Sequence, residues 1–284
     1  MNKHRIIEMI QASGNMPDIP RDFGEILKML LKPAEYDMDL CVESFSRFPQ
    51  LEANLIQVLN YSSNLNREIR TIKEAINYLG AQRARIISIA FVTRLLLPDN
   101  KGRARLFNNK TYWKHNLGTS IAAYIIAEKT NYSDKDKILT YGLIHDIGIT
   151  ALDICLPEEI DKVHELHQKG VHQIVAEKII LGGITHADIG LWICKEWGLP
   201  DEIAEVVGYH HTPSLAKKYV DDVNIMHLAD SISTNYYEKL LGNHTTFIYA
   251  DKIMEKYNID KEFIDSIINK LPSEVDKLNR RFKL

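Results

Sequence analysis

The 284-residue sequence has few cysteines and no cysteine pair. Its three cysteines, Cys41, Cys155 and Cys194, are far apart, odd in number and without Cys-x-x-Cys spacing. This pattern argues against a disulfide framework and against a cysteine zinc site. It is typical of a protein that stays in a reducing cytoplasm.

Long apolar runs and an excess of one charge are also absent. The longest apolar runs, such as IISIAFV at 86–92, are far shorter than the roughly 20 residues that cross a bilayer. The charged start MNKHRIIEMI is not typical of a signal peptide. The net charge of −3 shows neither a basic excess for nucleic acid nor an acidic tail. We therefore expect a soluble, cytoplasmic protein that binds neither nucleic acid nor membrane.

The alternating pattern of strands is essentially missing, and helical spacing of apolar residues recurs throughout, so we predict an all-α protein. In the first half, helices are expected at 20–31, 40–48, 51–59, 71–79 and 81–97. The break PDNKG at 98–102 then predicts a boundary. We expect two packed helical subdomains, residues 1–100 and 101–284.

The second half predicts further helices with recognisable start signals. Capping boxes are expected where Ser133 precedes Asp136 and where Thr185 precedes Asp188. The helix from Ser133 is expected to continue through 145–146 and to loosen at Gly148. Other helices are expected at 112–130, 157–170, 185–197, 200–211, 223–240 and 261–270.

Metal-capable side chains recur through this second half, at the ends or within the expected helices. A divalent cation needs several nitrogen or oxygen donors from different elements that converge on one centre. A single helical histidine is more often a packing or surface residue. A series of metal-capable residues spread over several expected helices favours a metal centre. The candidate ligands are His115, His145, Asp146, His186, His210, His211 and Asp230.

The adjacent pair His145 and Asp146 has a specific use. Neighbouring helical residues diverge by about 100°, so both reach one centre only when it lies between their directions. The imidazole can then bind one metal, and the two carboxylate oxygens of Asp146 can bridge to a second metal. The remaining histidines (His4, His164, His167, His172, His227 and His244) lack such neighbours and are interpreted as non-ligands, with His164 and His167 solvated.

Several segments together resemble a known family. YWKHN, LIHDIG, GITHADIGLWICKEWGLP, GYHH and HLAD resemble the HD superfamily of metal-dependent phosphohydrolases, and more narrowly the HDOD domain proteins of bacterial signalling. MPDIPRDFGEILKML, LIQVLNYSSN and IRTIKEAINYLGAQRARIISIA resemble the first half of that family. The resemblance covers about residues 15–235. It implies an N-terminal HDOD subdomain and an HD-type C-terminal bundle.

The ligand order is similar to that of HD-GYP and seven-helix membrane HD phosphodiesterases, which act on cyclic dinucleotides. That likeness implies one metal at His115, His145, Asp146 and Asp230, and a second at Asp146, His186, His210 and His211. Asp146 would bridge the two ions and position a hydroxide. Ile149 stands where HD-GYP enzymes have a lysine, and TPSLAKKY follows His211 in place of Gly-Tyr-Pro.

Two functions follow from this resemblance. The first is an HDOD-type signalling protein with a binuclear divalent-metal centre that binds a nucleotide or phosphate and acts on a separate protein partner. The alternative is an active phosphohydrolase or phosphodiesterase on a nucleotide or cyclic dinucleotide. Histidines with carboxylates favour iron or manganese, with zinc, nickel and magnesium as alternatives.

Overall fold

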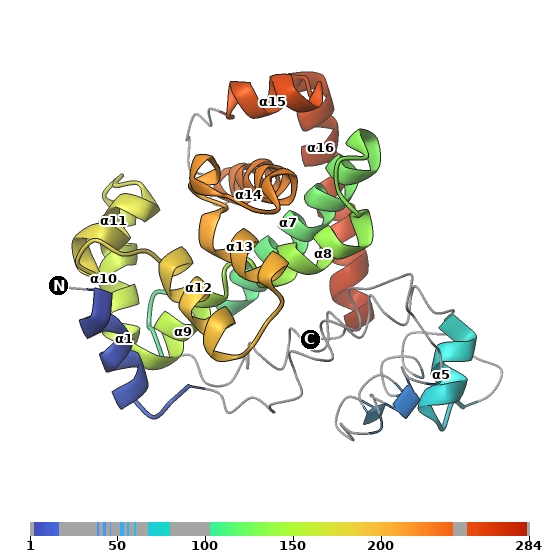
Figure 1. Ribbon diagram of the computed structural model, residues 1–284, viewed down its shortest axis with the longest axis horizontal. Coiled ribbons are helices and arrows are strands. Elements are labelled where there is room, and N and C mark those ends of the chain that lie inside the picture. The colour runs from blue at the N-terminus through green and yellow to red at the C-terminus, as the bar shows by residue number, and fades with distance from the viewer. Residues whose placement is uncertain are drawn as a thin grey trace.

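A computed structural model of the protein shows a helical bundle in the second half of the chain (Figure 1). The structure describes residues 3–16, 68–79, 103–240 and 249–282, with single positions between 39 and 60. The expected helices at 20–31 and 81–97, most of those at 40–48 and 51–59, and the boundary at 98–102 lie outside the described residues. The proposed division into two subdomains therefore stays a prediction.

Every regular element in the described ranges is helical, which confirms the all-α prediction. The α-helices are α1 (Lys3–Ala12), α5 (Ile72–Leu79), α7 (Asn109–Thr130), α8 (Lys135–Ile144), α9 (Ile147–Cys155), α10 (Pro157–Gln168), α11 (Gln173–Ile180), α12 (His186–Glu196), α13 (Asp201–Tyr209), α14 (Val220–Leu240), α15 (Asp251–Tyr257) and α16 (Lys261–Phe282), and a 3₁₀ turn, η2, spans Pro213–Leu215. The sequence did not lead us to expect α1, α11 or α15, which have only 7 to 10 residues.

The long helix α7 is central to the bundle, where it packs against α8, α14 and α16. A second layer is formed by α12, which contacts both α9 and α13. Apolar side chains fill the space between these layers, and Leu117 of α7, Ile144 of α8 and Ile189 of α12 are buried within one continuous core. The N-terminal helix α1 packs on α9, with Ile6 and Ile10 completely buried.

Two helix boundaries differ from those expected. The N-cap residue of α8 is Asp134, whose Oδ1 accepts hydrogen bonds from the backbone N–H groups of Asp136 and Lys137. Ser133 instead donates its hydroxyl to Asp222, so the capping box predicted at Ser133 is wrong. The capping box of Thr185 and Asp188 is confirmed.

The expected single helix through residues 145–148 is broken earlier than predicted. Helix α8 ends at Ile144, His145 is its C-cap, and Asp146 lies between the helices with φ −99° and ψ 20° before α9 begins. The two adjacent candidate ligands thus lie where the helical backbone is interrupted. The interruption therefore relaxes the constraint that a continuous helix would place on them.

Among the residues that the structure describes, one segment, Lys135–Cys155, is long and apolar enough to cross a membrane by length and composition, and 94% of its most apolar 18-residue window is buried inside the bundle. Burial on this scale is what a core element requires. The segment comprises α8 and α9, which pack against α7 and α12.

Two buried carboxylates hold the chain that leads into α7. Asp161 of α10 accepts hydrogen bonds from the backbone N–H groups of Arg105 (2.9 Å) and Leu106 (2.8 Å), and Asp153 of α9 accepts one from Ala104 (3.0 Å). Burial opposes ionisation of Asp161, but these hydrogen bonds and the Arg105 guanidinium lower its pKa below the usual value. The ionised carboxylate therefore stabilises the entry to α7.

Replacing Asp161 with Ala should destabilise the protein, because two backbone donors lose their acceptor. We expect a loss of about 1–2 kcal/mol in the free energy of unfolding at pH 7, measured by urea denaturation. Since the native pKa is depressed, this stabilisation is present above the unfolded pKa of about 4 and is lost as the pH falls through the lower native value. Glu165→Ala, an exposed change on the same helix, is the control, and an equal effect in both variants would contradict the assignment.

Candidate metal centre

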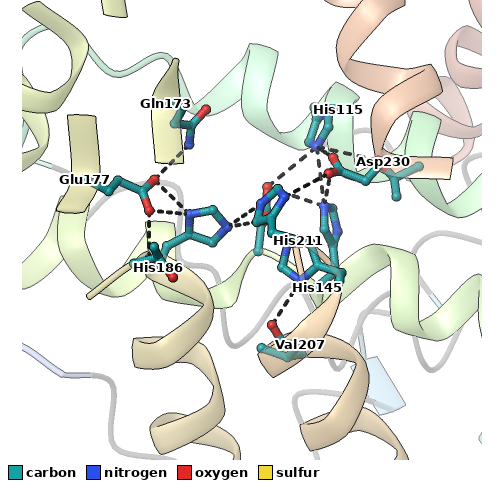
Figure 2. A network of polar contacts seen from close by, with 12 residues as sticks. His115, His145, Gln173, Glu177, His186, Val207, His211 and Asp230 are labelled. Atoms are coloured by element: carbon teal, nitrogen blue, oxygen red, sulfur yellow. Dashed lines mark hydrogen bonds and ion pairs between the residues drawn. The ribbon is translucent and has the colours of Figure 1, made fainter. Parts of the chain in front are cut away.

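The structure brings all seven predicted residues into one cluster, and Figure 2 labels His115, His145, His186, His211 and Asp230 within it. They come from α7, from the break between α8 and α9, from the first residue of α12, from the end of α13 and from α14. Six of them, all but Asp230, form two overlapping groups, in each of which the ligand atoms lie within 4.8 Å of one another. Asp146 belongs to both groups.

The two oxygens of Asp146 face different pairs of imidazoles. Its Oδ1 lies 3.1 Å from Nε2 of His186 and 3.3 Å from Nε2 of His210. Its Oδ2 lies 3.5 Å from Nε2 of His115 and 3.4 Å from Nε2 of His145. The carboxylate is thus placed between two sets of nitrogen donors, as a bridging ligand would be.

Asp230 of α14 completes the cluster on the side of His115. Its Oδ1 is 3.2 Å from Nε2 of His115 and 3.6 Å from Nε2 of His145. Its Oδ2 is 3.6 Å from Nδ1 of His211. Each of the two groups of donors therefore has at least one carboxylate and two imidazoles.

The hydrogen bonds of three histidines determine which ring nitrogen faces the centre. Nδ1 of His145 donates to the carbonyl of Gly142 (2.9 Å), and Nδ1 of His210 donates to the carbonyl of Val207 (2.9 Å), because a carbonyl can only accept. Nδ1 of His186 is bound to the carboxylate of Glu177 (2.7 Å). All three rings therefore present Nε2 toward Asp146, which is the arrangement of metal-binding histidines.

Several of these polar atoms are buried without a hydrogen-bond partner. Oδ1 of Asp146 and Nε2 of His210 are both in this state in the described structure, and Nε2 of His211 lies only 3.0 Å from Nε2 of His186. An unpaired buried acceptor is costly unless a ligand satisfies it. The donor set and its unpaired atoms fit a divalent cation.

Electrostatics keep the two carboxylates ionised. Burial would raise the pKa of Asp146, but the charges of His145 and His186 lower it well below its usual value. The pKa of Asp230 is lowered in the same way, against burial, by hydrogen bonds to His115 and His145. Burial lowers the pKa of His210, which favours the neutral imidazole that a metal requires.

The cluster is closed on one side and open on the other. The side chains of His145 and His210 are 0% exposed, whereas His115 is 14% and His211 is 24% exposed. An added ligand would reach the centre past His115 and His211.

Close helix contacts at three glycines place the ligands. A Cβ on Gly148 would lie 2.0 Å from the carbonyl oxygen of His186, and one on Gly142 would lie 2.5 Å from Cα of Ser120. A Cβ on Gly118 would lie 2.6 Å from Oγ of Ser233. These contacts join α9 to α12, α8 to α7, and α7 to α14, and each lies within a few residues of a candidate ligand.

Glu177 and Tyr112 contribute to the site and were not predicted from the sequence. Glu177 lies behind His186, and the Tyr112 hydroxyl donates to the backbone carbonyl of Asp146 (2.7 Å). The only signal for Tyr112 was its position three residues before His115, and a glutamate nine residues before His186 gave none. His227, one of the histidines interpreted as non-ligands, donates a hydrogen bond from Nδ1 to the backbone carbonyl of His210 (2.7 Å).

The interpretation of His164 as solvated is wrong, because its Nε2 is buried, whereas the side chain of His167 is 35% exposed. His164 stacks on Phe107. His167 contacts Val171 and lies 3.6 Å from Glu238. Both residues are partly exposed.

With this geometry in place, the chain can be compared with known proteins. The HDOD domain family matches residues 16–213, and the chain belongs to this family. The matched range contains six of the seven clustered residues and ends before Asp230, which α14 supplies.

Solved structures share the fold across almost the whole chain. An HDOD domain protein of unknown function from Geobacter sulfurreducens is 21% identical with a TM-score of 0.72, and the match covers 100% of both chains. A candidate phosphohydrolase from Shewanella amazonensis SB2B is 19% identical with a TM-score of 0.70, covering 96% of this chain and 97% of the other. A candidate signal transduction protein from Marinobacter aquaeolei VT8 is 16% identical with a TM-score of 0.77, covering 100% of this chain and 62% of the other. At these identities the likeness shows the fold.

A curated relative of Treponema pallidum (strain Nichols), an uncharacterized protein, is 23% identical over 214 residues. The match covers 72% of this chain but only 39% of the relative. The chain therefore matches well under half the length of that protein.

Adding a single methyl group at the contact between α9 and α12 should disrupt the cluster. Gly148→Ala would place Cβ against the backbone of His186, which cannot move without shifting that ligand. We expect a destabilisation of about 1–3 kcal/mol from overpacking, with a more than tenfold drop in divalent-metal affinity by isothermal titration. Glu165→Ala, an exposed change on α10, is the control. The contact would be shown unimportant if both variants bound metal like the wild type.

Proposed function

We propose that this protein is an HDOD-type signalling protein whose C-terminal bundle carries a binuclear divalent-metal centre. The observation that carries the proposal is the position of Asp146, whose two oxygens face His186 and His210 on one side and His115 and His145 on the other. A single carboxylate between two sets of nitrogen donors suits a pair of cations about 3.5–4 Å apart.

The donors divide naturally between two ions. One ion would be held by His115, His145, Asp146 and Asp230, and the other by Asp146, His186, His210 and His211. When bound, such ions act as Lewis acids and lower the pKa of bound water. The protein residues orient the donors, exclude water from the closed side and leave an approach past His115 and His211.

Charge balance favours an anionic ligand at this opening. Asp146 and Asp230 at the cluster and Glu177 behind it contribute three negative charges, and two divalent cations contribute four positive charges. The single remaining positive charge in a largely buried site is best neutralised by an anion such as a phosphate or the phosphate of a nucleotide. The histidine-rich donor set favours iron or manganese, with zinc, nickel and magnesium as alternatives.

The second candidate function is an active phosphohydrolase on a nucleotide or cyclic dinucleotide. The open side of the centre favours it, because a metal-bound nucleophile needs room for a substrate. Ile149 argues against the specific chemistry of HD-GYP enzymes, since this side chain is buried in the apolar core and brings no cation to a phosphate. We therefore propose ligand binding and signalling to a separate protein as the main role, with no role for nucleic acid or membrane.

Removing the shared carboxylate should remove both metals. We expect wild-type protein purified without chelator to contain about two divalent ions per chain, and Asp146→Ala to contain less than about a tenth of that, because each ion loses a ligand. The measurement is elemental analysis, with Asp265→Ala, an exposed change on α16, as the control. Loss of only one ion would contradict the bridging role, and a wild-type content below about a tenth of an ion per chain would overturn the metal centre.

A turnover screen distinguishes the two candidate functions. Protein loaded with manganese or iron should bind inorganic phosphate or a nucleoside phosphate without hydrolysing nucleoside phosphates or cyclic dinucleotides. Hydrolysis that disappears in Asp146→Ala would favour the phosphohydrolase instead. Binding is measured by calorimetry, and turnover by phosphate release and by chromatography of the nucleotides.

A further inference from the structure

Glu177 is a buried carboxylate directly behind the metal cluster, on the short helix α11 (Figure 2). Its side chain is 0% exposed. It is too far back to face the centre itself, because both of its oxygens are engaged with the opposite edge of the His186 ring. Any influence of Glu177 on a metal must therefore pass through His186.

The contacts of Glu177 determine the orientation of that ring. Its Oε1 and Oε2 lie 2.7 Å and 2.8 Å from Nδ1 of His186. Oε2 also accepts the backbone N–H of His186 at 2.8 Å. Gln173, one turn earlier on α11, donates its amide to Oε1 at 3.0 Å. The carboxylate is therefore held in place and in turn holds both the ring and the backbone of His186.

Burying a carboxylate completely is costly unless a positive charge compensates it. Within the described residues, the hydrogen bonds of Glu177 run to His186 and Gln173, and its ion pair is with the His186 ring. A cation on Nε2 of His186 would place a positive charge at the far edge of the same ring. Carboxylate–histidine–metal arrangements of this kind raise the basicity of the ligand and fix its tautomer.

We propose that Glu177 is the positioning residue of the His186 half of the centre and that it makes the two metal sites inequivalent. The inference rests on the proposed binuclear centre. The other rings with a defined Nδ1 contact, His145 and His210, donate to neutral carbonyls. Among these three rings, His186 is therefore the one whose Nδ1 contacts a charged group. The ion that His186 would bind differs from the other ion in this respect.

The test is a calorimetric titration of the metal-free protein with Mn²⁺ alone. Wild type should show two binding events. Glu177→Gln keeps the size of the side chain but removes its charge and one acceptor, so we expect one event to weaken about 10- to 100-fold while the other changes by less than about 3-fold. Glu196→Gln makes the same chemical change at an exposed position in the last turn of α12, and both of its events should match the wild type.

Two further measurements guard against a variant that simply fails to fold. Gln173→Met removes only the amide that holds Oε1, and Gln173 is partly exposed, so folding should persist while the same single event weakens by a smaller factor. In protein loaded with Zn²⁺, nitrogen-15 NMR of the histidine rings should show His186 with a proton on Nδ1. That Nδ1–H signal should shift in Glu177→Gln and remain unchanged in Glu196→Gln.

The outcomes separate this inference from the function on which it rests. If wild type binds two ions and Glu177→Gln binds both with unchanged affinity, the positioning role is wrong and the binuclear centre stands. Equal weakening of both events would show that Glu177 acts on the whole bundle, which also overturns the inference. If wild type binds no Mn²⁺, the binuclear centre and the inference both fail.

Discussion

The structure depends on a buried carboxylate at a break between two helices. Asp146 is enclosed by imidazoles on both sides, and its ionisation in this setting requires those positive or metal-capable groups around it. Because a buried charge without partners is strongly destabilising, the helices that carry His115, His186 and His210 must all reach Asp146. The packing of the C-terminal bundle is organised around this requirement.

Small residues make that convergence possible. Helix axes usually lie 8–10 Å apart, but an imidazole and a carboxylate must approach to within a few ångströms to share a ligand. Gly118, Gly142 and Gly148 each lie against a neighbouring element where a Cβ would collide. The Tyr112 hydroxyl then holds the carbonyl of Asp146 at the break. The site is thus supported by backbone contacts as well as by its ligands.

Membership of the HDOD family agrees with this architecture, because the matched residues 16–213 include six of the seven clustered residues. Helix α1 contacts α9, the helix that follows Asp146 directly. Helix α1, near the beginning of the chain, is therefore packed against the helix that begins directly after the shared carboxylate.

The sequence alone determined the helical class and the capping box at Thr185, because these depend on residue chemistry and on spacing along one element. It also predicted the seven metal-capable side chains that the structure brings together, and their role as ligands stays a proposal. It could not show the break between His145 and Asp146, since LIHDIGITALDIC is apolar and periodic enough for one continuous helix, and tertiary contacts to α7 and α12 decide where it bends. Glu177 was equally hidden. Its role depends on α11 lying against the first turn of α12, and that contact is decided only when helices distant in sequence pack together.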